Sequence, residues 1–164
     1  KNVHIVLCIL LNLFLNTTFS MNNKILLIDD SSSEPLLLAS AIAKCERNIA
    51  LESFSDSIYA VKELLRRSKE DLEELPNLIL IDLNMPGYTG IEVLKILRKE
   101  EHFRYTPILI MTSSCLDSDL KDCLAAGANC VLVKPSSHKR YVEIVQTTYD
   151  YWFNTVKRLD SGFY

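Results

Sequence analysis

The sequence predicts an α/β protein with a parallel five-stranded sheet that helices cover on both faces. Segments with strand character alternate with segments of helical periodicity five times along the chain. Three of the strand segments are almost continuously apolar, which is typical of parallel strands buried on both faces. Alternating strands and helices with short connections favour right-handed crossovers and a doubly wound sheet.

The first two strand–helix units follow one another closely. Strands are expected at 24–29 and 50–54. Between them, the segment 33–46 has apolar residues at the spacing of a helix. A second helix is expected after Asp56, whose side chain is a suitable N-cap.

The last three strand–helix units make up the rest of the chain. The strands are expected at 78–82, 108–111 and 130–133, and the helices at 90–99, 117–126 and 137–158. Gly127 is a suitable residue to end the helix 117–126, because glycine readily adopts the left-handed conformation found after helices. The last helix is longer than a five-stranded domain usually needs, so we expect it to extend beyond the sheet.

Residues 1–20 do not match the rest of the chain. Their apolar run, 5–15, is too short to cross a bilayer, which needs about 20 residues. One interpretation is a secretion signal. The other, which we favour, is that the protein begins at Met21 and that 1–20 come from an upstream reading frame or an expression vector. We therefore expect one domain at 21–164, with an extended C-terminal helix and no output domain.

Composition narrows the class of partner. The formal net charge of −3 gives no basic surface for nucleic acid, and no membrane contact is expected. The five cysteines are an odd number without a CxxC pair, which favours reduced, mostly buried thiols over a disulfide framework or a zinc site.

Polar residues follow the carboxyl ends of four of the five strands. They are Asp29, Asp30, Asp82, Thr112 and Lys134. Because these ends meet at one edge of a parallel sheet, the three acids would lie close together and raise one another's pKa values. Mg²⁺, which prefers carboxylate oxygens, would compensate their charge together with the lysine. Four of the five residues also have a purely structural alternative: helix caps for Asp29 and Thr112, a turn for Asp82, and solvation for Lys134.

Four motifs carry a resemblance to a known family. They are LIDD (27–30), LIDLNMPGYTGIEVL (80–94), ILIMTSS (108–114) and VLVKPS (131–136). In this order and at these separations they resemble the receiver domains of two-component response regulators, the CheY-like superfamily, over about 24–150. The resemblance implies a flavodoxin-like (βα)5 fold with strand order 2-1-3-4-5.

The resemblance also implies a phosphoacceptor and its metal. Asp82 would accept a phosphoryl group from a histidine kinase or a histidine phosphotransfer protein. Asp30, Asp82 and the backbone carbonyl of Asn84 would bind Mg²⁺, for which Mn²⁺ can substitute. Asp29 would act through a metal-bound water. The protein would catalyse its own phosphoryl transfer and slow autodephosphorylation without being a dedicated enzyme.

Two further positions would contact the phosphoryl group. Lys134 would pair with one phosphoryl oxygen, and Thr112 would donate its hydroxyl to another. The bond before Pro135 is a candidate cis peptide, as is common in the family. Val131 occupies the position where receivers usually carry an aromatic switch residue, which leaves the role of that position open.

Three other classes of protein are alternatives to a receiver domain. A haloacid-dehalogenase-like phosphatase needs a second acid two residues after its nucleophile, where this chain has Asn84. A nucleotide-binding flavodoxin-like module needs a glycine-rich loop after the first strand, where this chain has DDSSSE. A pseudo-receiver that acts as a phosphorylation-independent interaction module remains an alternative.

The aromatic end of the last helix is the expected output surface. Tyr149, Tyr151, Trp152 and Phe153 are suited to bind a partner or a second copy of the chain through the last helix and strand, with local packing as the alternative. This end resembles the small bacterial regulators of phytochrome-type and hybrid histidine kinases. A phosphohistidine donor and reduced thiols both imply a cytoplasmic location.

Overall fold

The computed structural model describes residues 23–114 and 116–156. The strands are β1 (Asn23–Ile28), β2 (Ile49–Phe54), β3 (Leu78–Asp82), β4 (Ile108–Thr112) and β5 (Cys130–Val133). The helices are α2 (Glu34–Lys44), α3 (Ser57–Glu70), α4 (Gly90–Leu97), α5 (Asp117–Ala125) and α6 (His138–Tyr149), with short 3₁₀ turns η1 (Leu72–Glu74) and η2 (Glu101–Phe103) and a π-helical segment η3 (Asp150–Thr155).

All five strands are parallel and lie in the order β2-β1-β3-β4-β5, which confirms the predicted topology. The chain leaves β1 toward β2 on one side and returns past β1 to β3 on the other. The carboxyl ends of β1 and β3 are therefore neighbours at the point where the strand order reverses. In doubly wound sheets this point is where ligands bind.

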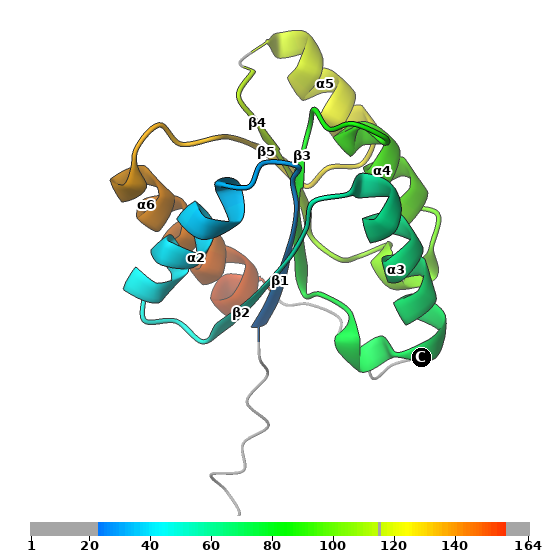
Figure 1. The fold of residues 1–164 in the computed structure, drawn as a ribbon, viewed down its shortest axis with the longest axis horizontal. Helices are drawn as coiled ribbons and strands as arrows, with labels where there is room; N and C mark the ends of the chain where they lie inside the picture. The colour runs from blue at the N-terminus through cyan, green and yellow to red at the C-terminus, as the bar shows by residue number, and fades with distance from the viewer. Residues whose placement is uncertain (1–22, 115, 157–164) are drawn as a thin grey trace, which may run out of the picture.

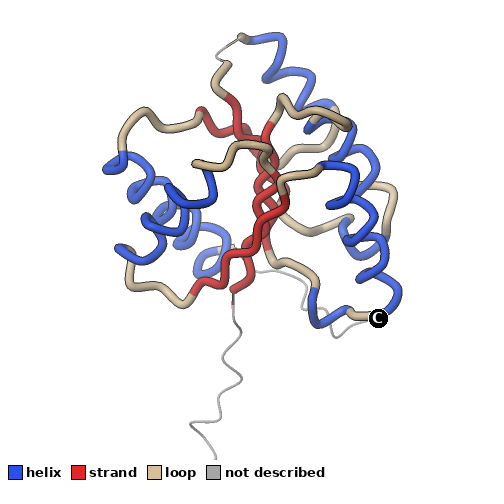
Figure 2. The backbone as a smooth tube through the Cα atoms, in the orientation of Figure 1, coloured by secondary structure: helices blue, strands red, loops and turns tan. Residues whose placement is uncertain are grey.

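The sheet separates two layers of helices. Figures 1 and 2 show α2 and α6 together on one face and α3, α4 and α5 on the other. Each layer forms its own apolar cluster against the sheet. Every residue of β3 and β4 is buried, because both of these central strands are covered on two faces.

Asp56 and Gly127 lie at helix ends as predicted, and a capping box that was not predicted starts a third helix. The carboxylate of Asp56 accepts a hydrogen bond from the backbone N–H of Tyr59 at 2.8 Å and caps α3. Thr89 and Glu92 form a reciprocal capping box at the start of α4. Gly127 has a φ of +101° one residue after the C-cap of α5, as expected.

The last helix differs from the prediction of one continuous helix over 137–158. The α-helix ends at Tyr149, and a wider π-helical segment follows, within which the N–H of Val156 bonds to the carbonyl of Tyr151. This turn brings Trp152 and Phe153 against the α2/α6 cluster. Burial of these rings explains the change in helical geometry, which residue periodicity alone does not anticipate; residues 157 and 158 lie outside the described part of the chain.

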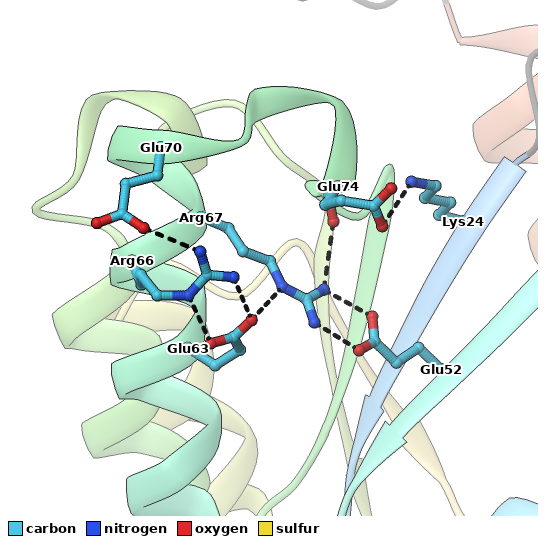
Figure 3. A network of polar contacts seen from close by, with 7 residues as sticks. All are labelled: Lys24, Glu52, Glu63, Arg66, Arg67, Glu70 and Glu74. Carbon is cyan, nitrogen blue, oxygen red and sulfur yellow. Dashed lines mark hydrogen bonds and ion pairs between the residues drawn. The ribbon is translucent and has the colours of Figure 1, made fainter.

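A polar network joins the edge strand β2 to α3 and η1 (Figure 3). The guanidinium of Arg67 bonds both carboxylate oxygens of Glu52, at 2.7 and 2.8 Å, and one oxygen of Glu63 at 2.8 Å. Hydrogen bonds from Arg66 and Arg67 lower the pKa of Glu63 to about 2. The network fixes the charged segment 66–75, which precedes Pro76, against the sheet.

The thiols of the described residues are free. Cys45 and Cys123 are buried and Cys130 is half-buried, which agrees with the expectation of reduced thiols. Cys8 and Cys115 lie outside the described residues. Over the described ranges, no helix is both long and apolar enough to span a membrane.

Candidate functional site

The carboxyl ends of β1 and β3 bring two acids together. Asp29 directly follows β1, and its backbone N–H still bonds to the carbonyl of Phe54, which fixes its position beside β2. Asp82 is the last residue of β3. The two acids are only 1% and 6% exposed, whereas Asp30 is exposed at the rim. The site therefore combines two buried carboxylates with one that faces solvent.

Lys134 joins the two buried acids. Its ammonium nitrogen lies 2.8 Å from Oδ2 of Asp29 and 2.5 Å from Oδ1 of Asp82. The lysine is held at this edge because its backbone N–H bonds to the carbonyl of Thr112 at 2.8 Å. The contact rules out the alternative that Lys134 is simply solvated.

Burial dominates the electrostatics of the site. The pKa of the Asp82 carboxyl is raised, first by burial and then by repulsion from Asp29, although Lys134 opposes both effects. Burial pushes the pKa of Lys134 down, but its bonds to Asp29 and Asp82 outweigh this and raise it. Lys134 therefore stays charged, and Asp82 is a carboxylate in an unfavourable environment.

Each buried polar side chain at this edge also holds the start of its own loop. Asp29 accepts from the N–H of Ser31, Asp82 from that of Asn84, and Thr112 from that of Ser114, each at 2.9 Å. Helices α2 and α5 begin further on, with Ser33 and Leu116 as their N-caps. Asp29 and Thr112 are therefore not helix caps, while Asp82 does make the turn contact considered as its structural alternative.

The loop after Asp82 returns onto the backbone of that residue. A Cβ on Gly90 would lie 2.3 Å from the carbonyl oxygen of Asp82 and 3.0 Å from the Cα of Leu83. The N–H of Gly90 bonds to the carbonyl of Leu83 at 2.9 Å. Only glycine permits this approach, so the start of α4 is fixed directly against the end of β3.

The same loop is held from α3. The buried hydroxyl of Ser57 donates to the carbonyl of Pro86 at 2.9 Å and accepts from the N–H of Tyr88 at 2.8 Å. Gly87 between them has a φ of +81°. Sequence reasoning missed Ser57, because a serine at the start of a helix carries no signal that it bonds a loop far along the chain.

The donor set suits a hard divalent cation. Asp29 and Asp82 share one ammonium, which leaves one negative charge without compensation in the buried part of the site, and the exposed Asp30 adds a second at its rim. Across the described ranges, no three His, Cys, Asp or Glu side chains lie together as a metal-binding group, the three acids of this site included. A metal here would therefore need backbone carbonyl and water ligands beside the carboxylates, which is the usual manner of binding Mg²⁺.

Comparison with known proteins decides the family. The family model for the response regulator receiver domain matches residues 25–146. This chain is a response regulator receiver. Receivers are signalling regulators of two-component systems rather than dedicated enzymes.

The relatives of this receiver match over most of their own length. The probable methanogenesis regulatory protein FilR2 of Methanothrix harundinacea is 29% identical over 78% of this chain and 82% of that protein. Response regulator Rcp1 of Synechocystis is 28% identical over 80% of this chain and 90% of Rcp1. The crystal structure of the Mn²⁺-bound form of Rcp1 matches with a TM-score of 0.71 and 27% identity, covering 84% of this chain and 99% of that chain.

Two predictions concern the strand and loop of this receiver that contain Val131 and Pro135, and one of them is wrong. Val131, in register with Ile110 of β4, is half-buried against the cluster beneath α3, α4 and α5. The bond between Lys134 and Pro135 is trans, as are all peptide bonds of the described residues, so the cis hypothesis is wrong. The trans form is the intrinsically favoured one, by about 0.5–1 kcal/mol.

The aromatic residues at the end of α6 and in η3 divide into two groups. Trp152 and Phe153 are half-buried against the α2/α6 cluster, and the hydroxyl of Tyr149 accepts from the side chain of Asn23. Tyr151 is 53% exposed and lies edge-on to Trp152. Local packing thus engages three of the four, and their role as an interface stays a prediction.

Proposed function

We propose that Asp82 accepts a phosphoryl group from a phosphohistidine of a histidine kinase or a histidine phosphotransfer protein. The observation that carries the proposal is the shared contact of Lys134 with Asp29 and Asp82 at the switch point of the sheet. A carboxylate oxygen of Asp82 would attack phosphorus and form an acyl phosphate, while the bond between phosphorus and the histidine nitrogen breaks.

The contacts of Asp82 assign different tasks to its two oxygens. Oδ2 accepts from the N–H of Asn84, which orients the carboxyl group. Oδ1 faces Lys134, and this ammonium can move onto the transferred phosphoryl group while keeping its bond to Asp29. Oδ1 is therefore the oxygen we assign as the nucleophile.

Asp30, Asp82 and the backbone carbonyl of Asn84 would hold Mg²⁺, with Asp29 acting through a bound water. The metal would neutralise charge on the phosphoryl group during transfer. The uncompensated negative charge of the site supports a divalent ion. The Mn²⁺-bound form of the relative Rcp1 supports a divalent metal at this site.

Thr112 would contact the phosphoryl group from β4. Its side chain is 2% exposed and its Oγ1 accepts from the N–H of Ser114. The hydroxyl proton can then be donated to a phosphoryl oxygen, as hydroxyl groups both donate and accept. Thr112 and Lys134 would hold the product from two neighbouring strand ends.

We further propose that the domain spans 21–164, acts in the cytoplasm and signals by protein contact. A homodimer through the last helix and strand is the form of contact we expect. The exposed side chains of Tyr151 and Val133, at 53% and 51%, support an open surface on these elements. Size-exclusion chromatography of the phosphorylated and unphosphorylated protein would test this.

The decisive experiment measures the intact mass of the 164-residue chain after incubation with acetyl phosphate. A gain of one phosphoryl group is expected with Mg²⁺ and not without it, and Asp82→Asn should show no gain. No gain in the wild-type protein, from acetyl phosphate or from a histidine kinase, would contradict the proposal. A phosphorylation-independent interaction module would then be the better description.

A further inference from the structure

A buried hydrogen bond connects the first turns of α2 and α6. The hydroxyl of Tyr141 donates to Oε1 of Glu34 at 2.7 Å, and the two residues are 4% and 6% exposed. Glu34 is the first residue of α2, and Tyr141 is the fourth of α6. A buried carboxylate requires such a partner, because an unpaired charge in the interior is costly.

Each end of this bond is attached to a segment of the candidate site. Glu34 follows the loop that carries Asp29 and Asp30. Tyr141 follows the short segment that begins at Lys134, and its N–H bonds to the carbonyl of Ser137 at 3.1 Å. The two segments thus meet twice: through Lys134 and Asp29 at the sheet edge, and through Tyr141 and Glu34 between the helices.

The apolar packing beside the segment that carries Lys134 leaves a small void. A small apolar cavity of about 20 Å³ lies between α6 and the sheet, and its walls include Leu132, Pro135 and Tyr141. Side chains around a void lack the dispersion contacts that hold a close-packed core. The hydrogen bond from Tyr141 to Glu34 therefore fixes the distance between the first turns of α6 and α2 beside this void.

The pKa of the Tyr141 hydroxyl is raised by its surroundings. Burial raises the pKa of the Tyr141 hydroxyl, and the carboxylates of Glu34 and Asp29 raise it further. The hydroxyl consequently remains a neutral donor at physiological pH. The contribution of Asp29 to this pKa is smaller than that of Glu34, which bonds the hydroxyl directly.

We propose that Glu34 and Tyr141 are positioning residues, which hold the acid loop 29–33 and the segment 134–137 in register for metal and phosphoryl binding. This inference rests on the proposed function of the site. It extends the site to two residues that contact neither the metal nor the phosphoryl group.

The test compares Tyr141→Phe with a matched control on the same helix. Tyr149→Phe also removes a hydroxyl that accepts a hydrogen bond, from Asn23, but at the other end of α6. Isothermal titration calorimetry of each full chain with Mg²⁺ should show a loss of affinity of about tenfold in Tyr141→Phe, by analogy with partners that orient metal ligands. Tyr149→Phe should bind Mg²⁺ like the wild type.

A second readout follows the backbone without any metal. Amide hydrogen exchange at Ser31 and Lys134 should be faster in metal-free Tyr141→Phe than in the wild type or Tyr149→Phe, relative to amides of β3. Glu34→Gln keeps a hydrogen-bond acceptor and should lose less Mg²⁺ affinity than Tyr141→Phe. This order of effects separates positioning from a general loss of stability.

The possible outcomes separate the inference from the function on which it rests. Wild-type Mg²⁺ affinity and exchange in Tyr141→Phe would overturn the inference and leave the proposed function intact. Equal losses in Tyr141→Phe and Tyr149→Phe, or in Tyr141→Phe and Glu34→Gln, would also overturn it. If the wild-type chain bound no Mg²⁺ and accepted no phosphoryl group, the proposed function would fail and the inference with it.

Discussion

The ammonium nitrogen of Lys134 lies 2.5 Å from a carboxylate oxygen of Asp82, although strand β4 separates β3 from β5. The same nitrogen bonds Asp29, so a single positive charge is shared between two buried acids. This arrangement makes the site sensitive to any change in its balance of charge.

Replacing Lys134 with methionine should destabilise the protein at neutral pH. Two buried carboxylates would then lack their cation, and removing one partner of a buried ion pair costs about 3–5 kcal/mol. We expect a loss near the lower end in urea denaturation at pH 7, because the lysine side chain is 17% exposed. The loss should shrink in acid as the carboxyl groups become protonated.

Lys139 of α6 supplies the control for this substitution. It is exposed, and Lys139→Met should change the free energy of unfolding by less than about 0.5 kcal/mol. Equal effects of the two methionine substitutions would contradict the interpretation of Lys134 as the compensating charge.

Replacing Asp82 with asparagine should stabilise the metal-free protein. The native pKa of Asp82 is raised above its ordinary value of 3.8, so the native state holds this proton more tightly than the unfolded state. Wild-type stability therefore falls as pH rises from about 3.8 through the native pKa, and the asparagine variant lacks this loss. We expect a gain of roughly 1 kcal/mol at pH 7.

Thermal unfolding between pH 4 and pH 8 without metal measures this difference. The advantage of Asp82→Asn over the wild type should grow as pH rises and then level off. Asp56→Asn is the matched control, because Asp56 is an exposed N-cap and asparagine caps helices equally well. A variant at position 82 that is less stable than the wild type at pH 7 would refute the prediction.

Much of the site could be predicted from the sequence because its residues directly follow strands that can be recognised locally. Apolar runs such as 78–82 mark buried parallel strands, and the polar residue at the end of each run must lie at one edge of the sheet. The pattern therefore predicts that Asp29, Asp82 and Lys134 lie together. The contacts of Lys134 agree with it.

The parts that were missed depend on contacts between distant segments. The bond of Tyr141 to Glu34 and the bonds of Ser57 to the loop after β3 have no local pattern, since any buried hydroxyl needs some partner. The π-helical turn after Tyr149 likewise follows from where Trp152 and Phe153 find apolar surface. Helical periodicity describes one element and not its neighbours.

Gly90→Ala should disturb the candidate site without altering any of its polar groups. The added Cβ would lie 2.3 Å from the carbonyl oxygen of Asp82, and this contact is with backbone that cannot simply rotate away. We expect a loss of about 1–3 kcal/mol in the free energy of unfolding, as for other overpacked positions. Mg²⁺-dependent phosphoryl uptake from acetyl phosphate should also slow.

Lys95→Ala on the exposed face of the same helix separates these effects from helix propensity. Alanine is a good helix former there, so stability and uptake should stay near wild-type values. If Gly90→Ala took up phosphoryl groups as fast as Lys95→Ala, the close approach of α4 to Asp82 would not matter for the site.

Arg67→Met should destabilise the protein more than Arg66→Met. Both arginines bond Glu63, but the side chain of Arg67 is 11% exposed and that of Arg66 is 46% exposed. Arg67 also joins β2 to α3 through Glu52 and lies over the ring of Phe54. We expect a loss of about 2 kcal/mol for Arg67→Met, typical of hydrogen bonds to charged groups, and a clearly smaller loss for the exposed Arg66→Met.

Salt distinguishes the two positions in urea denaturation. Exposed pairs are screened when the Debye length falls from about 10 Å at 0.1 M to about 3 Å at 1 M, while partly buried pairs are screened less. The effect of Arg66→Met should therefore vanish at 1 M NaCl, whereas most of the effect of Arg67→Met should remain. Equal losses for both variants at low salt would show that the bonds to Glu52 contribute little to holding the edge strand.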